Sequence, residues 1–263
     1  MGISSSLSMI IICLLATLFT FNSCDNTSNI ASECIAESVE YENWSAYSLN
    51  NGIITLTIVP DIGGRVMEFN LGEHPLFYVN SAEFGKLYNP PKTEAEQVWH
   101  NYGGYKTWPA PQSRWGGPPD PIGSLLDGGK YTGRITKQSG DVAEVEVVSP
   151  RDDVIGIQFI RQIKILKGTT HVIARQTMVN ISDKPVTWSI WDVTQVPAKL
   201  NAEQKFSNQA WIYFPLNPNS IYKKGYRLLD GKQFNPEWHP NVVPGIMGVQ
   251  FQFIKGKIGS DNI

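Results

Sequence analysis

The stretch Gly103–Pro121 (GGYKTWPAPQSRWGGPPDP) carries side chains whose types suit a sugar. Lys106 and Gln112 supply cationic and amide donors, and Trp108 and Trp115 supply flat aromatic faces. A sugar ring stacks its C–H face on an indole, while such donors bond its hydroxyl groups. Five prolines and two Gly-Gly pairs predict a rigid loop here rather than a helix or a central strand. We expect a ligand-facing loop; the alternative is that its tryptophans only plug the core.

Three further side chains could act on or hold such a ligand. Arg65 follows a Gly-Gly turn and could reach a sugar hydroxyl, although a solvated strand arginine is the commoner outcome. Asp192 lies between Trp191 and Val193, as a sugar ligand or as a carboxylate at the edge of the core. His100 and Asp192 are weak catalytic candidates. The alternative interpretation of His100 is an ordinary surface or capping histidine.

Composition narrows the class of protein. The chain has 263 residues, 41% of them hydrophobic, and a net charge of −2, which favours a packed core over disorder. No cluster of Lys and Arg forms a footprint for phosphates, so we expect no nucleic-acid partner. No CxxC pair or Cys/His cluster suggests zinc, and we predict neither a metal nor a cofactor.

The N-terminus is predicted to direct export. Met9–Phe21 is an apolar run too short to span a bilayer comfortably, and it suits the hydrophobic part of a signal peptide. The sequence Phe-Asn-Ser-Cys that ends at Cys24 looks like a lipobox, so we expect residues 1–23 to be removed and Cys24 to be lipidated. This predicts a membrane-anchored lipoprotein facing the periplasm or the cell surface. If Cys24 is not lipidated, a bridge to Cys34 is possible.

The rest of the chain is predicted to be a tether over residues 24–46 and one β domain over residues 47–263. Ile53–Val59 and Arg65–Leu71 are rich in β-branched or alternating residues and flank a Pro-Asp-Ile-Gly-Gly turn, which predicts a hairpin. Val66 should face away from Arg65 and Met67. Further strands are expected at the following ranges: Leu76–Val79, Tyr131–Gln138, Val142–Ser149, Ile155–Leu166, Thr170–Asn180, Val186–Val193, Trp211–Phe214, Tyr222–Leu229 and Val249–Ile254.

These strands recur at roughly ten-residue spacing with Gly, Asn and Pro turns, which is typical of a large antiparallel β-sandwich. In Ile155–Leu166 the isoleucines and Phe159 alternate with polar residues, and Arg161 is assigned to the polar set with one slip that suggests a bulge. The chain stops soon after a strand at Ile263, and we expect a truncated product or a fragment.

Several of these phrases resemble the galactose-mutarotase-like (aldose 1-epimerase-like) superfamily. They are the Pro60–Arg65 turn, the two long strands Ile155–Leu166 and Thr170–Asn180, and the turn that follows them. The GGxKxWPAPQ motif from Gly103 resembles a bacterial branch of that superfamily, known mainly as a domain of unknown function. The resemblance implies a β-supersandwich with a sugar-binding cleft on one concave face.

Ring opening by such an enzyme needs a base for the anomeric hydroxyl and an acid for the ring oxygen. The resemblance would place one histidine in a His-Gly-Gly phrase, and here His100 is displaced from the Gly-Gly pair by two residues. It would place the acid histidine roughly where Asp192 stands, and the base glutamate beyond Ile263. We therefore expect an exported carbohydrate-binding lipoprotein and favour recognition over reaction, which leaves open whether it is an enzyme. The alternatives are an aldose 1-epimerase or related sugar isomerase, and a lipoprotein whose Trp/Pro loop docks a protein partner.

Overall fold

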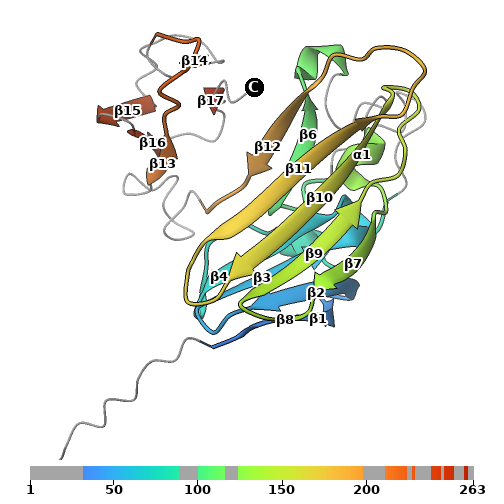
Figure 1. Ribbon diagram of the computed structural model, residues 1–263, viewed down its shortest axis with the longest axis vertical. Coiled ribbons are helices and arrows are strands. Elements are labelled where there is room, and N and C mark those ends of the chain that lie inside the picture. Colours follow the sequence, from blue (N-terminus) through green and yellow to red (C-terminus); the bar gives the residue numbers. More distant parts are fainter. Residues whose placement is uncertain are drawn as a thin grey trace, which may run out of the picture. The chain divides into compact units, whose positions relative to one another are not determined.

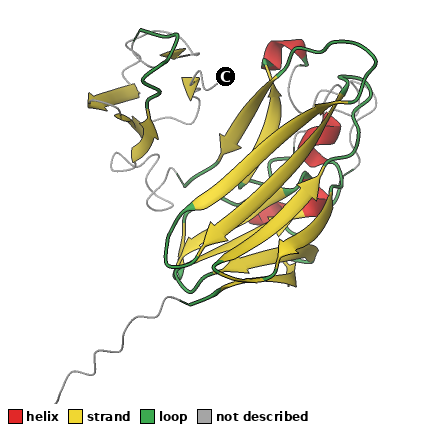
Figure 2. Cartoon of the chain, in the orientation of Figure 1, coloured by secondary structure: helices red, strands yellow, loops and turns green. Residues whose placement is uncertain are grey.

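The computed structural model describes residues 32–88, 100–115, 124–197 and 211–223, together with the short strands 227–228, 238–243, 246–251 and 258–259. Figure 2 shows that strands dominate this part of the chain and that its helical segments are short. The protein is an all-β antiparallel sandwich, as the sequence predicts. None of the described helices is both long and apolar enough to cross a membrane.

The larger sheet has the order β12-β6-β4-β3-β2-β1-β8, with β5 paired to β4. Its strands are β1 (Cys34–Tyr41), β2 (Trp44–Asn50), β3 (Ile54–Val59), β4 (Arg65–Leu71), β5 (His74–Pro75), β6 (Tyr105–Ala110), β8 (Ser139–Gly140) and β12 (Ser189–Thr194). The second sheet has the order β11-β10-β9-β7. Its strands are β7 (Thr132–Lys137), β9 (Val142–Val148), β10 (Ile157–Leu166) and β11 (Val172–Asn180).

Two smaller groups of strands follow in the chain. One sheet has the order β13-β16-β15, formed by β13 (Trp211–Pro215), β15 (Trp238–Val243) and β16 (Ile246–Phe251). The other pairs β14 (Arg227–Leu228) with β17 (Ile258–Gly259). The predicted strand 222–229 is described as a strand only at β14.

The two large sheets face each other across the main core, and Figure 1 shows the sheet of β11, β10, β9 and β7 lying over β2, β3 and β4. Apolar side chains from both sheets meet there without exposed surface, among them Leu49, Ile58, Val145 and Ile163. A second cluster, including Trp44, Met67 and Tyr102, covers the other face of the larger sheet. Val66 belongs to the first cluster and Met67 to the second, which confirms the predicted facing of β4.

The short helical segments lie between strands. They are η1 (Pro60–Ile62), η2 (Ser81–Glu83), η4 (Gln112–Arg114) and α1 (Ser124–Gly128). The predicted hairpin is confirmed: β3 and β4 pair antiparallel around η1 and the Gly63-Gly64 turn. The strand expected at Leu76–Val79 is wrong, because pairing with β4 falls earlier, at β5, and Val79 makes only an isolated bridge to Gly103.

Two predictions about the ends of the larger sheet need correction. The predicted tether is wrong for Cys34–Tyr41, which form β1, and for residues 44–46, which begin β2. Cys34 and Ala36 are buried, but the apolar Ile35 between them is exposed, so the sequence does not show the usual alternation. The loop predicted after Gly103 is wrong for Tyr105–Ala110, which forms β6 between β12 and β4. Pro109 is tolerated because β6 pairs along its length only with β12 and meets β4 at Tyr105 alone.

The strand Ile157–Leu166 also differs from its prediction. Its register with β9 and with β11 is continuous, so no bulge interrupts it. Every second residue from Ile157 to Ile165 is buried, and Arg161 is one of them. The apparent slip in the sequence pattern is therefore a cation that occupies a core position.

Candidate functional site

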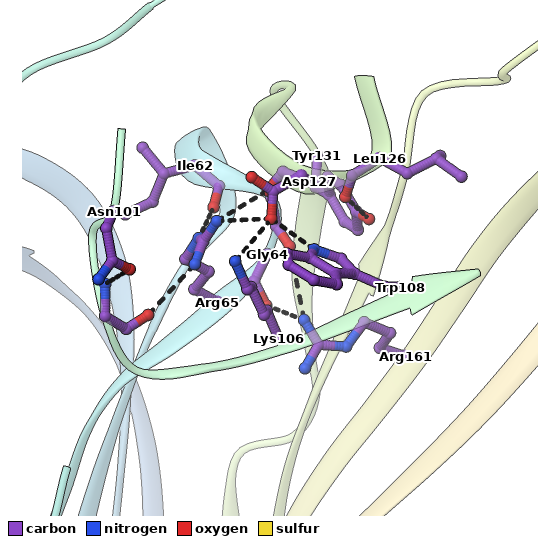
Figure 3. A network of polar contacts seen from close by, with 12 residues as sticks. Ile62, Gly64, Arg65, Asn101, Lys106, Trp108, Leu126, Asp127, Tyr131 and Arg161 are labelled. Atoms are coloured by element: carbon purple, nitrogen blue, oxygen red, sulfur yellow. Dashed lines mark hydrogen bonds and ion pairs between the residues drawn. The ribbon is translucent and has the colours of Figure 1, made fainter. Parts of the chain in front are cut away.

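The buried carboxylate of Asp127 lies among two cations and an indole N–H group (Figure 3). Asp127 Oδ1 lies 2.8 Å from Arg65 Nη2 and 3.1 Å from Lys106 Nζ, and it accepts a 2.6 Å hydrogen bond from Trp108 Nε1. Arg65, Lys106, Trp108 and Asp127 are each less than one-tenth exposed. We call these four residues the Asp127 cluster.

The local structure of each segment brings the side chains of the Asp127 cluster together. Arg65 opens β4 directly after the glycine turn, where its Nε donates to Ile62 O at 3.0 Å and its Nη1 to Gly103 O at 3.2 Å. Lys106 and Trp108 are two residues apart on β6 and so share a face. Asp127 comes from α1. Gly63 lets α1 approach, because a Cβ there would lie 1.9 Å from the Asp127 carbonyl oxygen.

Burial and neighbouring charges shift the pKa values of Lys106 and Asp127. Burial, reinforced by the neighbouring Arg65 cation, lowers the pKa of Lys106 to about 7, although Asp127 opposes the shift. Burial alone would raise the pKa of Asp127, but Arg65 and Lys106 outweigh it and hold that pKa below its ordinary value. Lys106 Nζ also lies 4.0 Å from the centre of the Trp108 ring, a cation–π contact. The Asp127 cluster therefore holds one carboxylate, whose charge is compensated by two neighbouring cations.

Arg161 adds a third fully buried cation next to this cluster. Its Nη1 donates to the carbonyl oxygen of Gly64 at 2.5 Å and approaches that of Gly63 at 3.5 Å. Its guanidinium carbon lies 5.0 Å from the centre of the Tyr105 ring. Its Nε and Nη2 make no hydrogen bond within the described structure, and no described carboxylate pairs with it.

A second group of polar side chains surrounds Tyr105. The Tyr105 hydroxyl donates to Asp192 Oδ1 at 2.9 Å and accepts from Gln176 Nε2 at 2.7 Å, while Thr107 Oγ1 donates to the same Asp192 oxygen at 3.0 Å. We call Tyr105, Thr107, Gln176 and Asp192 the Tyr105 cluster. Asp192 is exposed, Tyr105 and Gln176 are half-buried and Thr107 is buried. Burial raises the pKa of Tyr105 to about 12 against the opposing effect of Arg161, so its hydroxyl remains a donor near neutral pH.

The sequence-predicted residues divide between these groups. Arg65, Lys106 and Trp108 meet in the Asp127 cluster, and Asp192 lies in the Tyr105 cluster. His100 stacks on Tyr88 at 3.3 Å between ring centres, and its Nδ1 lies 3.8 Å from Glu83 Oε2. The two weak catalytic candidates therefore have separate partners and do not form an acid–base pair.

The predicted aromatic platform is not open to solvent. Trp115 is 1% exposed, donates through Nε1 to Pro109 O at 2.8 Å, and packs edge-on against Trp108. Trp108 also packs edge-on against Trp191. The interpretation in which Trp108 and Trp115 plug the core describes these two residues. Gln112, on η4, is half-buried, and residues 116–123 of the predicted loop lie outside the described residues.

Sequence reasoning missed Asp127, Arg161 and Gln176. The sequence suggests only an Asp-Gly-Gly turn at Asp127, although its position after two leucines is a signal of burial. Arg161 has the same parity as Ile157, Phe159 and Ile163, which is a signal that it faces the core. Within the described part of the chain, no three His, Cys, Asp or Glu side chains come together as a metal site.

One family matches part of the chain, over residues 45–118, and its description is Domain of unknown function (DUF4380). The match spans β2 to η4 and includes Arg65, Lys106 and Trp108 but not Asp127, Gln176 or Asp192. No curated protein and no solved structure matches the sequence.

Proposed function

We propose that this protein binds carbohydrate through a galactose-mutarotase-like β-sandwich and is exported as a lipoprotein anchored at Cys24. The observation that carries the binding proposal is the Tyr105 cluster. It presents a carboxylate, a phenol and an amide that are already hydrogen-bonded to one another and reach solvent at Asp192.

Such a group suits a hydroxyl-rich ligand. Each sugar hydroxyl donates one hydrogen bond and accepts others, so it needs both kinds of partner at fixed positions. Both bonds to Asp192 end on Oδ1, which leaves Oδ2 without a bond to any described residue and able to accept from a ligand hydroxyl. Gln176 Oε1 is buried without a hydrogen-bond partner in the described structure and is a second acceptor. Tyr105, Thr107 and Asp192 are hydrogen-bonded to one another before the ligand arrives, so ordering them costs little entropy when it binds.

Binding is favoured over catalysis by the separation of the candidate acid and base. His100 is engaged by Tyr88 and Glu83, whereas Asp192 is engaged by Tyr105 and Thr107. Ring opening needs both groups within reach of one sugar. The Tyr105 cluster offers recognition without requiring such a pair.

The test is the binding of a panel of monosaccharides and oligosaccharides to the full chain, followed by tryptophan fluorescence and calorimetry. The purification detergent must lack a sugar headgroup. Asp192→Asn should weaken the affinity for the sugar that binds by about tenfold, the effect of losing roughly one hydrogen bond to a charged acceptor. Asp183→Asn, an exposed carboxylate in the turn after β11, is the matched control and should leave it unchanged. Absence of binding across the panel, or equal effects of both variants, would contradict the proposal.

The export proposal is supported by the apolar run Met9–Phe21 and by the lipobox-like end at Cys24, both outside the described residues. Cys34, the possible bridge partner of an unlipidated Cys24, is a buried free thiol whose Sγ lies 3.5 Å from Asp141 O. Metabolic labelling with a radioactive fatty acid should mark the native chain and not Cys24→Ser. Labelling that persists in Cys24→Ser would reject Cys24 as the lipidated residue.

A further inference from the structure

We infer that the sugar bound here is an acidic one, a uronic acid whose carboxylate is held by Arg161. The inference rests on the proposed carbohydrate function and specifies its substrate class. It starts from an unusual cation. Arg161 has no exposed surface, yet its described partners are two backbone carbonyl oxygens and the face of an aromatic ring.

The charges around Arg161 do not balance. Arg65 and Lys106 share the carboxylate of Asp127, and that carboxylate makes no contact with Arg161. The other buried carboxylate of the described residues, Asp152, accepts hydrogen bonds from the backbone of its own turn and pairs with no cation. A buried charge without a partner is strongly destabilising, and native proteins rarely keep one without a use. An anion beside Arg161 would remove the imbalance.

The unpartnered atoms of Arg161 define the shape of that anion. Nη1 is bound to the glycine turn, whereas Nε and Nη2 are both without a hydrogen-bond partner in the described structure. These two nitrogens form one edge of the guanidinium plane and point their N–H groups in parallel. A planar carboxylate accepts two such parallel bonds at once, the strongest geometry that arginine offers.

Gln176 identifies what must lie next to the carboxylate. It is the direct cross-strand neighbour of Arg161 in the β10–β11 register, so the two side chains emerge about 5 Å apart on the same face. Its Nε2 is bound to the Tyr105 hydroxyl, and its Oε1 is buried without a partner among the described residues. An acceptor beside a cation calls for a ligand that carries a hydroxyl next to its carboxylate. In a pyranose uronic acid the 4-hydroxyl lies on the carbon next to the one that carries the carboxylate and supplies this pair, whereas the oxygens of a fully ionised phosphate can only accept.

We place the entry to Arg161 at the Tyr105 cluster. Tyr105 and Gln176 are half-buried and cover the guanidinium, while Asp192 is exposed beyond them. Asp192 then bonds sugar hydroxyls on the solvent side, and the carboxylate lies inside. Because Arg161 has no exposed surface, the Gln176 side chain would have to move to admit the ligand.

The experiment compares glucuronate and galacturonate with glucose and galactose by calorimetry on the full chain. Each acid should bind at least tenfold more tightly than its neutral counterpart. Arg161→Lys keeps the charge but removes the parallel donors, and it should abolish that preference. Arg151→Gln, an exposed arginine, is the control and should retain the preference.

A second variant keeps the test valid if Arg161→Lys does not fold. Gln176→Glu places a carboxylate opposite Arg161, so it should raise the thermal midpoint and reduce uronate affinity at least tenfold. Uronate affinity that is unchanged in Gln176→Glu would overturn the inference.

The remaining outcomes separate the two proposals. Equal affinities for acid and neutral sugars reject the acidic ligand and leave carbohydrate binding standing. Binding of lactate in an Arg161-dependent way, without binding of any sugar, rejects the carbohydrate function and retains a hydroxy-acid site. If neither sugars nor lactate bind, both proposals fail.

Discussion

The Asp127 cluster and the Tyr105 cluster use the same strand for opposite purposes. Lys106 and Trp108 leave β6 on one face and converge on Asp127, while Tyr105 and Thr107 leave it on the other and converge on Asp192. Asp127 is almost fully buried and its charge is compensated by Arg65 and Lys106. Asp192 is exposed and its partners are neutral hydroxyl groups.

This contrast indicates that the carboxylate of Asp127 is structural, whereas the carboxylate of Asp192 is accessible to a ligand. Removing one partner of a buried ion pair lowers the stability of the fold strongly, because the other charge is left buried without compensation. An exposed carboxylate loses little hydration and can exchange water for a ligand. Side chains that the sequence suggests form one sugar site are therefore divided by a sheet, with the structural carboxylate on one face and the proposed recognition site on the other.

The largest expected effect is that of Asp127→Ala. The variant leaves Arg65 and Lys106 buried without their carboxylate and orphans the Trp108 N–H, so it should lower the free energy of unfolding by about 3–5 kcal/mol. Urea denaturation measures it. Asp153→Ala removes an exposed carboxylate that pairs with Arg151 at 3.7 Å and should change stability by no more than about 0.5 kcal/mol. Similar losses in the two variants would remove the distinction between buried and exposed carboxylates.

Gly63→Ala should have the next largest effect. Gly63 has φ 82°, and its added Cβ would collide with the Asp127 carbonyl, which forces α1 away from the cations. We expect a loss of more than about 2 kcal/mol, from strain plus the weakened ion pair. Gly72→Ala is the control, because φ is 56° there but no atom lies within 4 Å of the added Cβ. It should cost only the left-handed backbone strain, about 1 kcal/mol. Equal losses would show that the approach of α1 is not tight.

The Asp127 cluster should also make stability depend on pH. The pKa of Lys106 falls from 10.5 to about 7 on folding, so between these values the unfolded chain binds more protons than the folded one. Stability should therefore rise with pH, by at most roughly 1.4 kcal/mol per pH unit. Chemical denaturation from about pH 7.5 to about pH 9 tests this. Lys106→Met should lose the rise, and a rise that persists in Lys106→Met would assign it to another group.

The smallest expected effect is that of Thr107→Val in the Tyr105 cluster. The change keeps the shape but removes one hydrogen bond to Asp192, and solvent can replace that bond at the exposed carboxylate. We expect a loss of about 1 kcal/mol or less in urea denaturation. A loss as large as that of Asp127→Ala would show that the Tyr105 cluster is structural as well.

The sheets are easier to predict from the sequence than the candidate sites. Strands such as Ile54–Val59 and Val142–Val148 are identified because alternation and β-branched residues are local signals. The strand at Tyr105–Ala110 is missed because Pro109 argues against a central strand, and only its pairing with β12 makes it acceptable. Arg161 is placed on the wrong face because a charge is expected to be solvated.

By itself the sequence determined the antiparallel β class, the hairpin around the Gly63-Gly64 turn, and the presence of polar and aromatic side chains near Lys106 and Asp192. These follow from periodicity and from turn residues, which act over a few positions. Only the tertiary structure decided that Arg65, Lys106 and Trp108 share Asp127, and that Arg161, Gln176 and Asp192 lie around Tyr105. Those partners are up to 87 residues apart in the chain, and their burial depends on how two sheets pack. No local pattern encodes that distance.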